Sequence, residues 1–160
     1  MARAFVGIGA NIGDAAGQVR AAINALAALS NTRLLAASSL YRTAPVGYAE
    51  QPDFVNAAVL LETALAARAL LAELQALERV HGRERRFKNA PRTLDLDLLL
   101  YGDLLVDEPG LSVPHPRLHE RAFALAPVVE IDPECVIPGR GPAREWLARC
   151  SDQRVQRLQP

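Results

Sequence analysis

The sequence of 160 residues has no excess charge of either sign, because 18 Lys plus Arg balance 18 Asp plus Glu. A broadly basic nucleic-acid binder and an acidic disordered tail are therefore excluded. Long apolar runs are also missing, since the longest, such as residues 57–61 and 98–101, fall far short of the roughly 18 residues that a membrane helix needs. We expect a soluble protein that binds neither nucleic acid nor a membrane.

Cysteines are scarce as well. Cys135 and Cys150 lie far apart in the chain and away from any histidine cluster, so they form neither a disulfide framework nor a metal knuckle. The first apolar run is interrupted by Gly7, Gly9 and Gly13 before a signal-like segment could form. Both observations indicate a protein of the reducing cytoplasm.

The apolar fraction is ordinary: 50% of the residues are apolar and 22% are charged. A chain of this length buries roughly 68–70% of the surface that its unfolded form exposes, so it needs no metal or disulfide to close a core. We therefore expect one domain, residues 1–160, in which any bound metal is functional.

The hydrophobic periodicity predicts the element order strand, helix, strand, strand, helix, strand. The expected segments are residues 4–10, 15–30, 32–43, 54–61, 66–81 and 93–101. This is the split βαβ pattern of an α+β ferredoxin-like sandwich, βαββαβ, whose two helices cover one face of the sheet and leave the other open. Residues 102–160 form a C-terminal extension, with helices expected near 120–126 and 143–150.

The last strand of this pattern alternates leucines with carboxylates. One face carries Leu94, Leu96, Leu98 and Leu100. Asp95 and Asp97 take the other face. If the leucines enter the core, both carboxylates project from the open face, where Phe54 and Asn56 of the strand at 54–61 also point.

Two carboxylates side by side stay ionised when cations lie between them. Mg²⁺ suits such a pair, because one or two carboxylates usually hold it while substrate phosphates and water complete its shell. The commoner meaning of Asp-x-Asp is a polar face on an amphipathic edge strand, and that alternative stays open. A cationic stretch adjoins the pair and favours the metal.

That stretch, residues 83–92, contains five basic residues and one acid. The basic ones are Arg83, Arg85, Arg86, Lys88 and Arg92. Guanidinium groups bind phosphate oxygens in pairs, so carboxylates and arginines together indicate metal-bound polyphosphate. A merely solvated loop is the alternative, since all but one of the basic residues in the chain are Arg.

Phe54 and Asn56 offer a flat ring and an amide two residues apart. The pair suits a planar heterocycle, by stacking and by paired hydrogen bonds, although core packing of Phe54 is an alternative. His115 and His119 are not a zinc site, because prolines flank His115 and no third ligand is near. A Walker glycine loop, a dinucleotide fingerprint and a nucleophile elbow are all missing from the sequence.

Residues 88–99, KNAPRTLDLDLL, closely resemble the signature of 6-hydroxymethyl-7,8-dihydropterin pyrophosphokinase, a family of folate biosynthesis. Four further segments resemble the family in the same order along the chain. They are residues 7–13 (GIGANIG), 41–45 with 51–57 (YRTAP and QPDFVNA), 113–117 (VPHPR) and 121–123 (RAF). The resemblance covers about residues 4–130.

The resemblance implies transfer of a pyrophosphoryl group from ATP to the hydroxymethyl group of the dihydropterin, with release of AMP. It implies two Mg²⁺ ions held by Asp95 and Asp97, with Arg83, Arg92 and Arg121 near the phosphates. The implied ATP positions are Gln75, Glu78, Arg85, Lys88, Arg92, Leu98, Ser112, His115 and Arg121. The implied pterin positions are Thr43, Ala44, Pro45, Val46, Phe54, Asn56 and Phe123. Loops 44–53 and 83–92 are expected to close over the ligands, and the enzyme is expected to be a monomer.

Four positions depart from the pattern of many relatives. Phe54 stands in place of Tyr, Asn89 in place of Trp, Gly110 in place of Arg and Pro116 in place of Tyr. Either Arg85 or Arg86 takes the role of the loop arginine, and Lys88 stands in for an arginine.

Two rival functions remain at this point. A nucleotidyl transferase would use the same aspartates but release pyrophosphate. An RNA-binding module of this topology would need stacked aromatics on two central strands and a basic balance, neither of which the sequence has.

Overall fold

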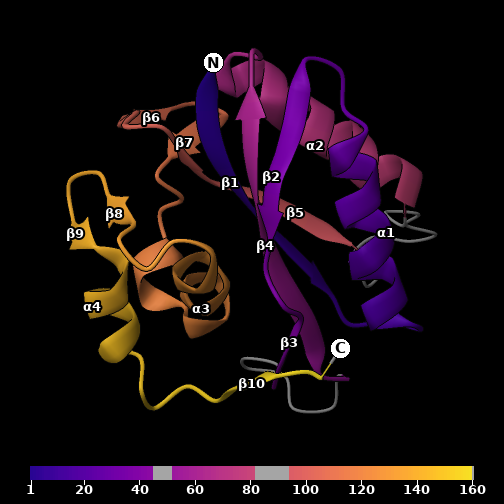
Figure 1. The fold of residues 1–160 in the computed structure, drawn as a ribbon, viewed down its shortest axis with the longest axis vertical. Helices are drawn as coiled ribbons and strands as arrows, with labels where there is room; N and C mark the ends of the chain where they lie inside the picture. Colours follow the sequence, from indigo (N-terminus) through magenta and orange to yellow (C-terminus); the bar gives the residue numbers. More distant parts are fainter. Residues whose placement is uncertain (45–51, 82–93, 160) are drawn as a thin grey trace.

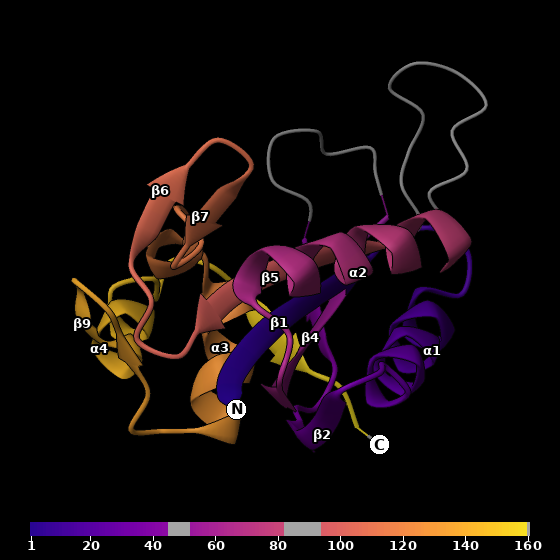
Figure 2. The same ribbon diagram turned by 90° about the horizontal axis from the view of Figure 1, so that it is seen from above.

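The computed structural model describes residues 1–44, 52–81 and 94–159, and at its centre lies a six-stranded sheet in which all neighbouring strands run antiparallel. The strands are β1 (Ala2–Ala10), β2 (Thr32–Ala37), β3 (Tyr41–Thr43), β4 (Phe54–Thr63), β5 (Asp95–Tyr101) and β10 (Val155–Arg157). Their order is β10-β3-β4-β1-β5, with β2 also pairing β4. Helices α1 and α2 lie on one side of this sheet and α3 on the other (Figures 1 and 2). The predicted α+β class is confirmed.

Two helices cover the first face of the sheet, as predicted. Helix α1 (Ala15–Ala27) begins at Asp14, whose side chain accepts a hydrogen bond from the Gly17 amide, and helix α2 is Ala67–His81. Their buried residues include Leu26, Leu70 and Leu74, each with 0% exposure, and they pack against the inward residues of β1, β4 and β5. This apolar face holds the strands in register.

The single strand predicted at residues 32–43 is divided into two strands in the structure, β2 and β3. The chain leaves the sheet between β2 and β3, where the hydroxyl of Ser38 accepts a hydrogen bond from the Ala58 amide and the Ser38 amide donates to the Ala58 carbonyl. β2 and β3 therefore pair with successive parts of the same long strand, β4. Hydrogen bonding by a serine side chain competes with the ladder and explains the break.

The predicted alternation of leucines in β5 holds for Leu94, Leu96 and Leu98, which enter the core under α1 and α2. It is wrong for Leu100, which packs on the opposite face with Phe5. The register shifts between Phe5 and Val6, opposite the extra residue Leu99, and such a bulge moves the following side chain to the other face.

The face that was expected to be open is covered over part of its area. The C-terminal region consists of β6 (Val106–Glu108), β7 (Leu111–Val113), a 3₁₀ turn η1 (Leu118–Glu120), α3 (Ala122–Ile131), β8 (Val136–Ile137), β9 (Gly141–Pro142) and α4 (Ala143–Ala148). Leu125 and Val128 of α3, with 0% exposure, pack with Phe5, Ala58 and Leu99 in a second core. The extension thus builds a third layer.

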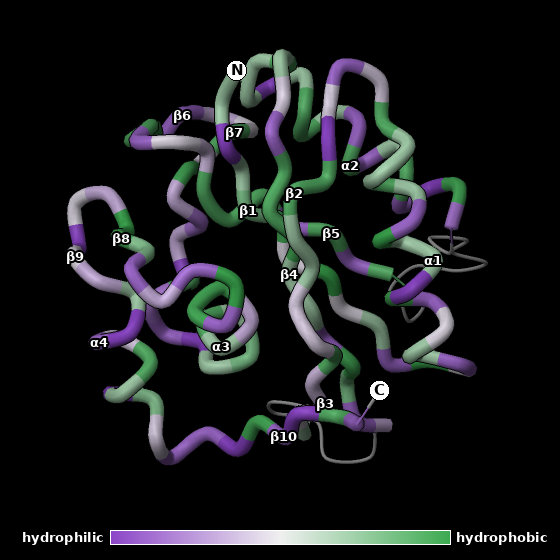
Figure 3. Tube along the Cα trace, in the orientation of Figure 1, coloured by the Kyte–Doolittle hydropathy of each residue, from purple (hydrophilic) through white to green (hydrophobic). Residues whose placement is uncertain are grey.

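The chain ends in the central sheet. β10 pairs with β3, with Val155 opposite Thr43, so residues from both ends of the sequence share one sheet. In Figure 3 the central strands carry much of the hydrophobic colour, whereas β10 at the sheet edge is mostly hydrophilic. Within the described residues there is no helix long and apolar enough to cross a membrane.

Candidate active site

A pocket of about 570 Å³ lies between the second face of the sheet and the C-terminal region. We call its first side the sheet wall, formed by Gly7, Gly9, Thr43, Ala44, Phe54, Asn56, Asp95 and Asp97. The opposite side, the C-terminal wall, is formed by His115, Arg117, Glu120, Arg121, Phe123 and Gln153. The structure therefore brings Asp95, Asp97, Phe54 and Asn56 together, as the alternation predicted.

Strand register arranges the sheet wall in rows. Asp95 lies opposite Gly9, which in turn lies opposite Asn56 on β4, while Asp97 lies opposite Gly7. Directly opposed residues project to the same face, so Asn56 and Asp95 share the row of Gly9, and Leu99 fills the space over Gly7. A Cβ atom on Gly9 would lie 2.9 Å from the Asn56 Oδ1 atom, closer than real Cβ contacts. Gly9 is thus needed for the position of the Asn56 amide.

Asp95 and Asp97 fit a divalent cation that takes oxygen ligands. Both are partly exposed in the pocket, two residues apart on one face of β5. Residues 1–44, 52–81 and 94–159 hold no group of three or more His, Cys, Asp and Glu side chains arranged for a metal. Two carboxylates that line one pocket match Mg²⁺, whose remaining ligands are usually water and substrate phosphates.

A polar pair lies at the end of the sheet wall near β3. The Asn56 Nδ2 atom donates to the Thr43 Oγ1 atom at 2.9 Å, and the two residues are only 5% and 6% exposed. Thr43 lies opposite Phe54 in the β3–β4 register, which places the ring beside the amide. Across the pocket the Arg121 guanidinium carbon lies 5.5 Å from the centre of the Phe123 ring. Two aromatic rings and one buried amide thus line this end.

The C-terminal wall is cationic. Burial lowers the pKa of His115, with Asp97 opposing the shift and Arg121 and Arg117 adding to it. The His115 Nδ1 atom accepts a hydrogen bond from the Arg117 amide at 3.1 Å, so the proton of the neutral ring is on Nε2. Burial and the neighbouring Arg117 lower the pKa of Arg121, and Asp97 again opposes. Arg121 stays charged, as arginine does in proteins.

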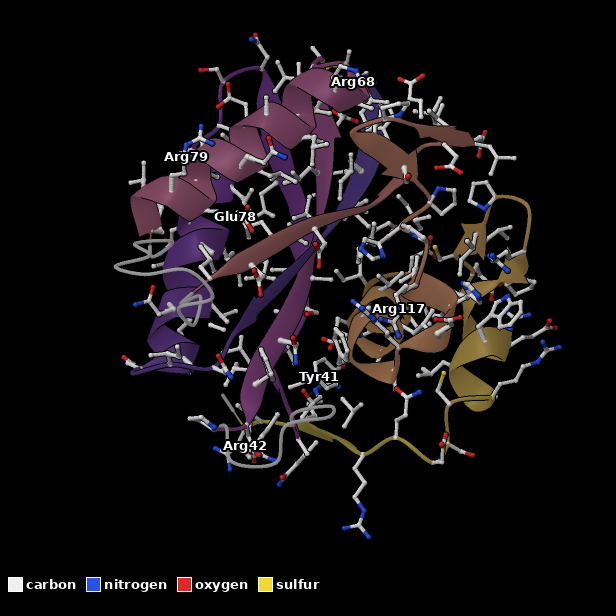
Figure 4. The ribbon with its side chains drawn as sticks, turned by 180° about the vertical axis from the view of Figure 1, so that it is seen from behind. Tyr41, Arg42, Arg68, Glu78, Arg79 and Arg117 are labelled. Carbon is white, nitrogen blue, oxygen red and sulfur yellow. The ribbon has the colours of Figure 1, made fainter. Side chains whose placement is uncertain are left out.

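Four predicted ATP residues, Gln75, Glu78, Leu98 and Ser112, do not line the pocket. The spacing of three residues predicts that Gln75 and Glu78 share a polar face of the helix, and this prediction is wrong. Gln75 is exposed, whereas Glu78 is 6% exposed and its Oε2 atom accepts a hydrogen bond from the Leu96 amide at 3.0 Å. Figure 4 shows Glu78 on the side of α2 that faces β5. The Leu98 side chain is in the core, and the Ser112 hydroxyl bonds Asp107 at 2.9 Å.

Six predicted site residues lie outside the described residues. They are Pro45, Val46, Arg83, Arg85, Lys88 and Arg92. Their assignments remain predictions.

The structure also adds wall residues for which the sequence reasoning had no role: Arg117, Glu120 and Gln153. Arg117 and Glu120 are three residues apart, and their side chains pair at 3.3 Å, a spacing that could have indicated the contact. Nothing in the sequence signals Gln153, because its side-chain hydrogen bonds are with residues more than 30 positions away.

Comparison with known proteins confirms the family resemblance. The sequence profile of 7,8-dihydro-6-hydroxymethylpterin-pyrophosphokinase (HPPK) matches residues 5–133. The Pseudomonas aeruginosa protein named 2-amino-4-hydroxy-6-hydroxymethyldihydropteridine pyrophosphokinase is 43% identical over 98% of this chain and 96% of its own length. The Haemophilus influenzae protein of the same name is 38% identical, with both chains covered fully.

A solved structure supports the fold. The structure titled "Crystal Structure Analysis of the HPPK-DHPS in complex with substrates" superposes with a TM-score of 0.72 at 12% identity, over 92% of this chain and 43% of that one. The profile match and the full-length relatives, taken with the pocket that joins two aspartates to a buried amide, show that the chain belongs to the HPPK family.

Proposed function

We propose that this chain transfers the pyrophosphoryl group of ATP to the hydroxyl of 6-hydroxymethyl-7,8-dihydropterin, yielding the pterin diphosphate and AMP. The observation that carries the proposal is one pocket that joins Asp95 and Asp97 to the Asn56–Thr43 pair in a member of the HPPK family. A carboxylate pair suits metal-bound phosphates, and the amide suits a flat heterocycle with adjacent donors and acceptors.

The acceptor binds at the aromatic end. Phe54 and Phe123, on opposite walls, hold the pterin ring between them, and ring stacking adds about 0.5–1.5 kcal/mol beyond burial. Asn56 supplies an acceptor and a donor, since the Thr43 hydroxyl occupies only one of its amide hydrogens. Backbone groups of residues 43–46 complete the recognition. An analogue lacking these polar edges would leave a buried amide unpaired and bind poorly.

The phosphates bind over β5. Asp95 and Asp97 hold two Mg²⁺ ions, which when bound neutralise the phosphate charge. Arg121 and Arg117 face the same space and stabilise negative charge on the transferred group. Arg83, Arg85, Lys88 and Arg92 add positive charge from the loop at 83–92.

The nucleotide lies along the edge of β5 that faces away from β1. The Leu96 amide points to Glu78 on this edge, and backbone groups alternate with a period of two residues, so the Leu98 amide and carbonyl also point away from β1. A purine edge pairs with such a donor and acceptor. Gln75 and Ser112 flank this position from α2 and β7.

No described side chain of the pocket is placed as a general base for the acceptor hydroxyl. The carboxylates of Asp95 and Asp97 serve the metal, the Glu120 carboxylate pairs with Arg117 at 3.3 Å, and the Nδ1 lone pair of His115 accepts from the Arg117 amide. The chain therefore accelerates in-line attack of the hydroxyl on the β-phosphorus by positioning and electrostatics. Closing the pocket over both substrates excludes water and prevents loss of ATP by hydrolysis.

We further propose that residues 1–160 are one domain acting as a monomer in the cytoplasm. The strand order supports a ferredoxin-like sandwich of split βαββαβ connectivity, with β2 and β3 in the place of a single strand. The third layer formed by α3 sets this version apart.

Phosphorus NMR of purified protein with ATP, magnesium and 6-hydroxymethyl-7,8-dihydropterin tests the reaction. The expected products are AMP and a pterin diphosphate, both dependent on the pterin. Release of pyrophosphate would instead support the nucleotidyl transferase, and a reaction with ADP as product would overturn pyrophosphoryl transfer. A parallel sample without pterin controls for ATP hydrolysis.

A further inference from the structure

We propose that Gln153, in the C-terminal segment 150–157, is a positioning residue that fixes Arg121 in the C-terminal wall. This inference rests on the proposed function, because the wall acts on the substrates named there. Gln153 lines the pocket but lies 30 or more residues after the rest of its wall.

The side-chain amide of Gln153 bonds the backbone on both sides of Arg121. Its Oε1 atom accepts from the Ala122 amide at 2.9 Å, and its Nε2 atom donates to the Glu120 carbonyl at 2.8 Å. A planar amide offers a donor and an acceptor at fixed separation, which neither a carboxylate nor a hydroxyl reproduces. The peptide units that flank Arg121 are therefore held from a single side chain.

These bonds replace a missing helix cap. Helix α3 begins after Arg121, and no side chain of the N-cap residue bonds the first turn. The first amides of a helix need partners, and the Ala122 amide finds one in Gln153. Without that bond the first turn of α3 loosens. Arg121 directly precedes this turn, and Phe123 lies in it.

Gln153 is itself anchored to the sheet wall. The backbone amide of Gln153 donates to the Cys150 carbonyl at 2.9 Å. Two residues later, Val155 pairs with Thr43, whose hydroxyl accepts a hydrogen bond from Asn56. Further along, the Arg157 guanidinium lies 3.4 Å from Glu130 on α3. Segment 150–157 thus links the two walls, so Gln153 sets Arg121 relative to the residues that hold the acceptor.

The test replaces Gln153 by methionine, which keeps the side-chain length and removes both hydrogen bonds. Gln156→Met, at an exposed glutamine three residues on, is the matched control. Because small displacements of positioning groups are costly, we expect kcat/KM for the pterin to fall about tenfold in Gln153→Met. Gln156→Met should stay within about twofold of the wild type.

A double-mutant cycle separates positioning from a general loss of stability. If Gln153 acts through Arg121, Gln153→Met in an Arg121→Ala background should change kcat/KM by less than about twofold. Equal kcat/KM for the two methionine variants would overturn the proposal. A tenfold loss that persists without Arg121 would overturn it as well.

Hydrogen exchange at the Ala122 amide tests the clamp without any turnover. We expect exchange to be more than about tenfold faster in Gln153→Met than in the wild type or Gln156→Met, since the amide loses its acceptor. Unchanged exchange would contradict the clamp. If the wild type fails to form AMP from ATP and pterin, the proposed function fails, and the exchange rates still decide whether Gln153 holds this backbone.

Discussion

The sheet wall and the C-terminal wall face each other across one pocket, but different bonds hold them. Strand register fixes Asp95, Asp97 and Asn56 through the backbone ladders of β1, β4 and β5. In the C-terminal wall, side chains bonded to distant backbone fix Arg121 and its neighbours, as the Gln153 amide does. Replacing a polar side chain of the sheet wall should therefore change chemistry with little change in geometry, whereas replacing one of the other wall should change geometry first.

Removal of divalent cations is the largest perturbation, and it acts on the sheet wall alone. We expect excess chelator to lower pterin-dependent AMP formation about 1000-fold or more, because the phosphate charge is no longer neutralised. Circular dichroism should stay unchanged, since neither core contains a metal cluster among the described residues. Readdition of Mg²⁺ restores the rate. Full activity in chelator would show that Asp95 and Asp97 serve another purpose.

Adding one methyl group to the sheet wall tests its register. Gly9→Ala places a Cβ atom 2.9 Å from the Asn56 Oδ1 atom, whereas Gly7→Ala places one 3.2 Å from the end of the flexible Leu99 side chain. We expect kcat/KM for the pterin to fall about 10- to 100-fold in Gly9→Ala and less in Gly7→Ala. Steady-state kinetics with both variants measures the difference. Equal losses would mean that the Asn56 amide is not the sensitive contact.

Replacing one buried leucine by Ala in each of the two cores compares the two faces of the sheet. Leu74 on α2 and Leu125 on α3 are both fully buried, at 0% exposure. Replacing either by Ala should cost about 2–5 kcal/mol in the free energy of unfolding, measured with denaturant. Only Leu125→Ala should also raise KM for the pterin, because α3 carries Phe123. A raised KM in Leu74→Ala would show that the two cores are coupled.

Glu130 of α3 accepts a hydrogen bond from Tyr41 of β3, and its replacement tests this contact. Burial tends to raise its pKa, but hydrogen bonds from Tyr41 and Ser39 and the charge of Arg157 outweigh it, so the pKa lies below its ordinary value. Burial and the bond to Glu130 raise the pKa of Tyr41, which keeps that phenol protonated and able to donate. Glu130→Gln should cost about 1–3 kcal/mol near neutral pH.

The pH dependence of this loss has a definite sign. A carboxylate with a lowered pKa stabilises the folded state above its unfolded pKa, and the stabilisation disappears as the pH falls through the folded pKa. Unfolding free energies measured from about pH 6 to about pH 3 should therefore fall more steeply for the wild type than for Glu130→Gln. If the unfolding free energies of the two proteins fell in parallel with pH, Glu130 would not be an acid-sensitive contact.

The sequence predicted the sheet wall better than the C-terminal wall for a physical reason. The alternation of Asp95 and Asp97 with leucines depends only on the two-residue period of a strand, so their common face could be inferred. The bulge at Leu99 and the break at Ser38 could not, because each depends on a tertiary hydrogen-bond pattern. Glu78 was placed on a polar face by its charge, but the buried Leu96 amide bonds it.

The third layer was beyond prediction for a related reason. Segments 118–131 and 150–157 are short, and what joins them is a set of contacts between side chains and backbone far apart in sequence. The sequence indicated helices near 120–126 and 143–150 but not which face of the sheet they cover. The family resemblance supplied Arg121 and Phe123, and it was silent on Gln153.

The role of the carboxylate pair is tested most directly by a single turnover of ATP and 6-hydroxymethyl-7,8-dihydropterin by Asp97→Ala, with both substrates saturating. We expect pterin binding, followed by the fluorescence of an oxidised pterin, to change little, because Asn56 and the aromatic rings remain. Transfer of the pyrophosphoryl group should slow by about three orders of magnitude or more, because a metal ligand is lost. Transfer at the wild-type rate in this variant would contradict the assignment of the carboxylate pair.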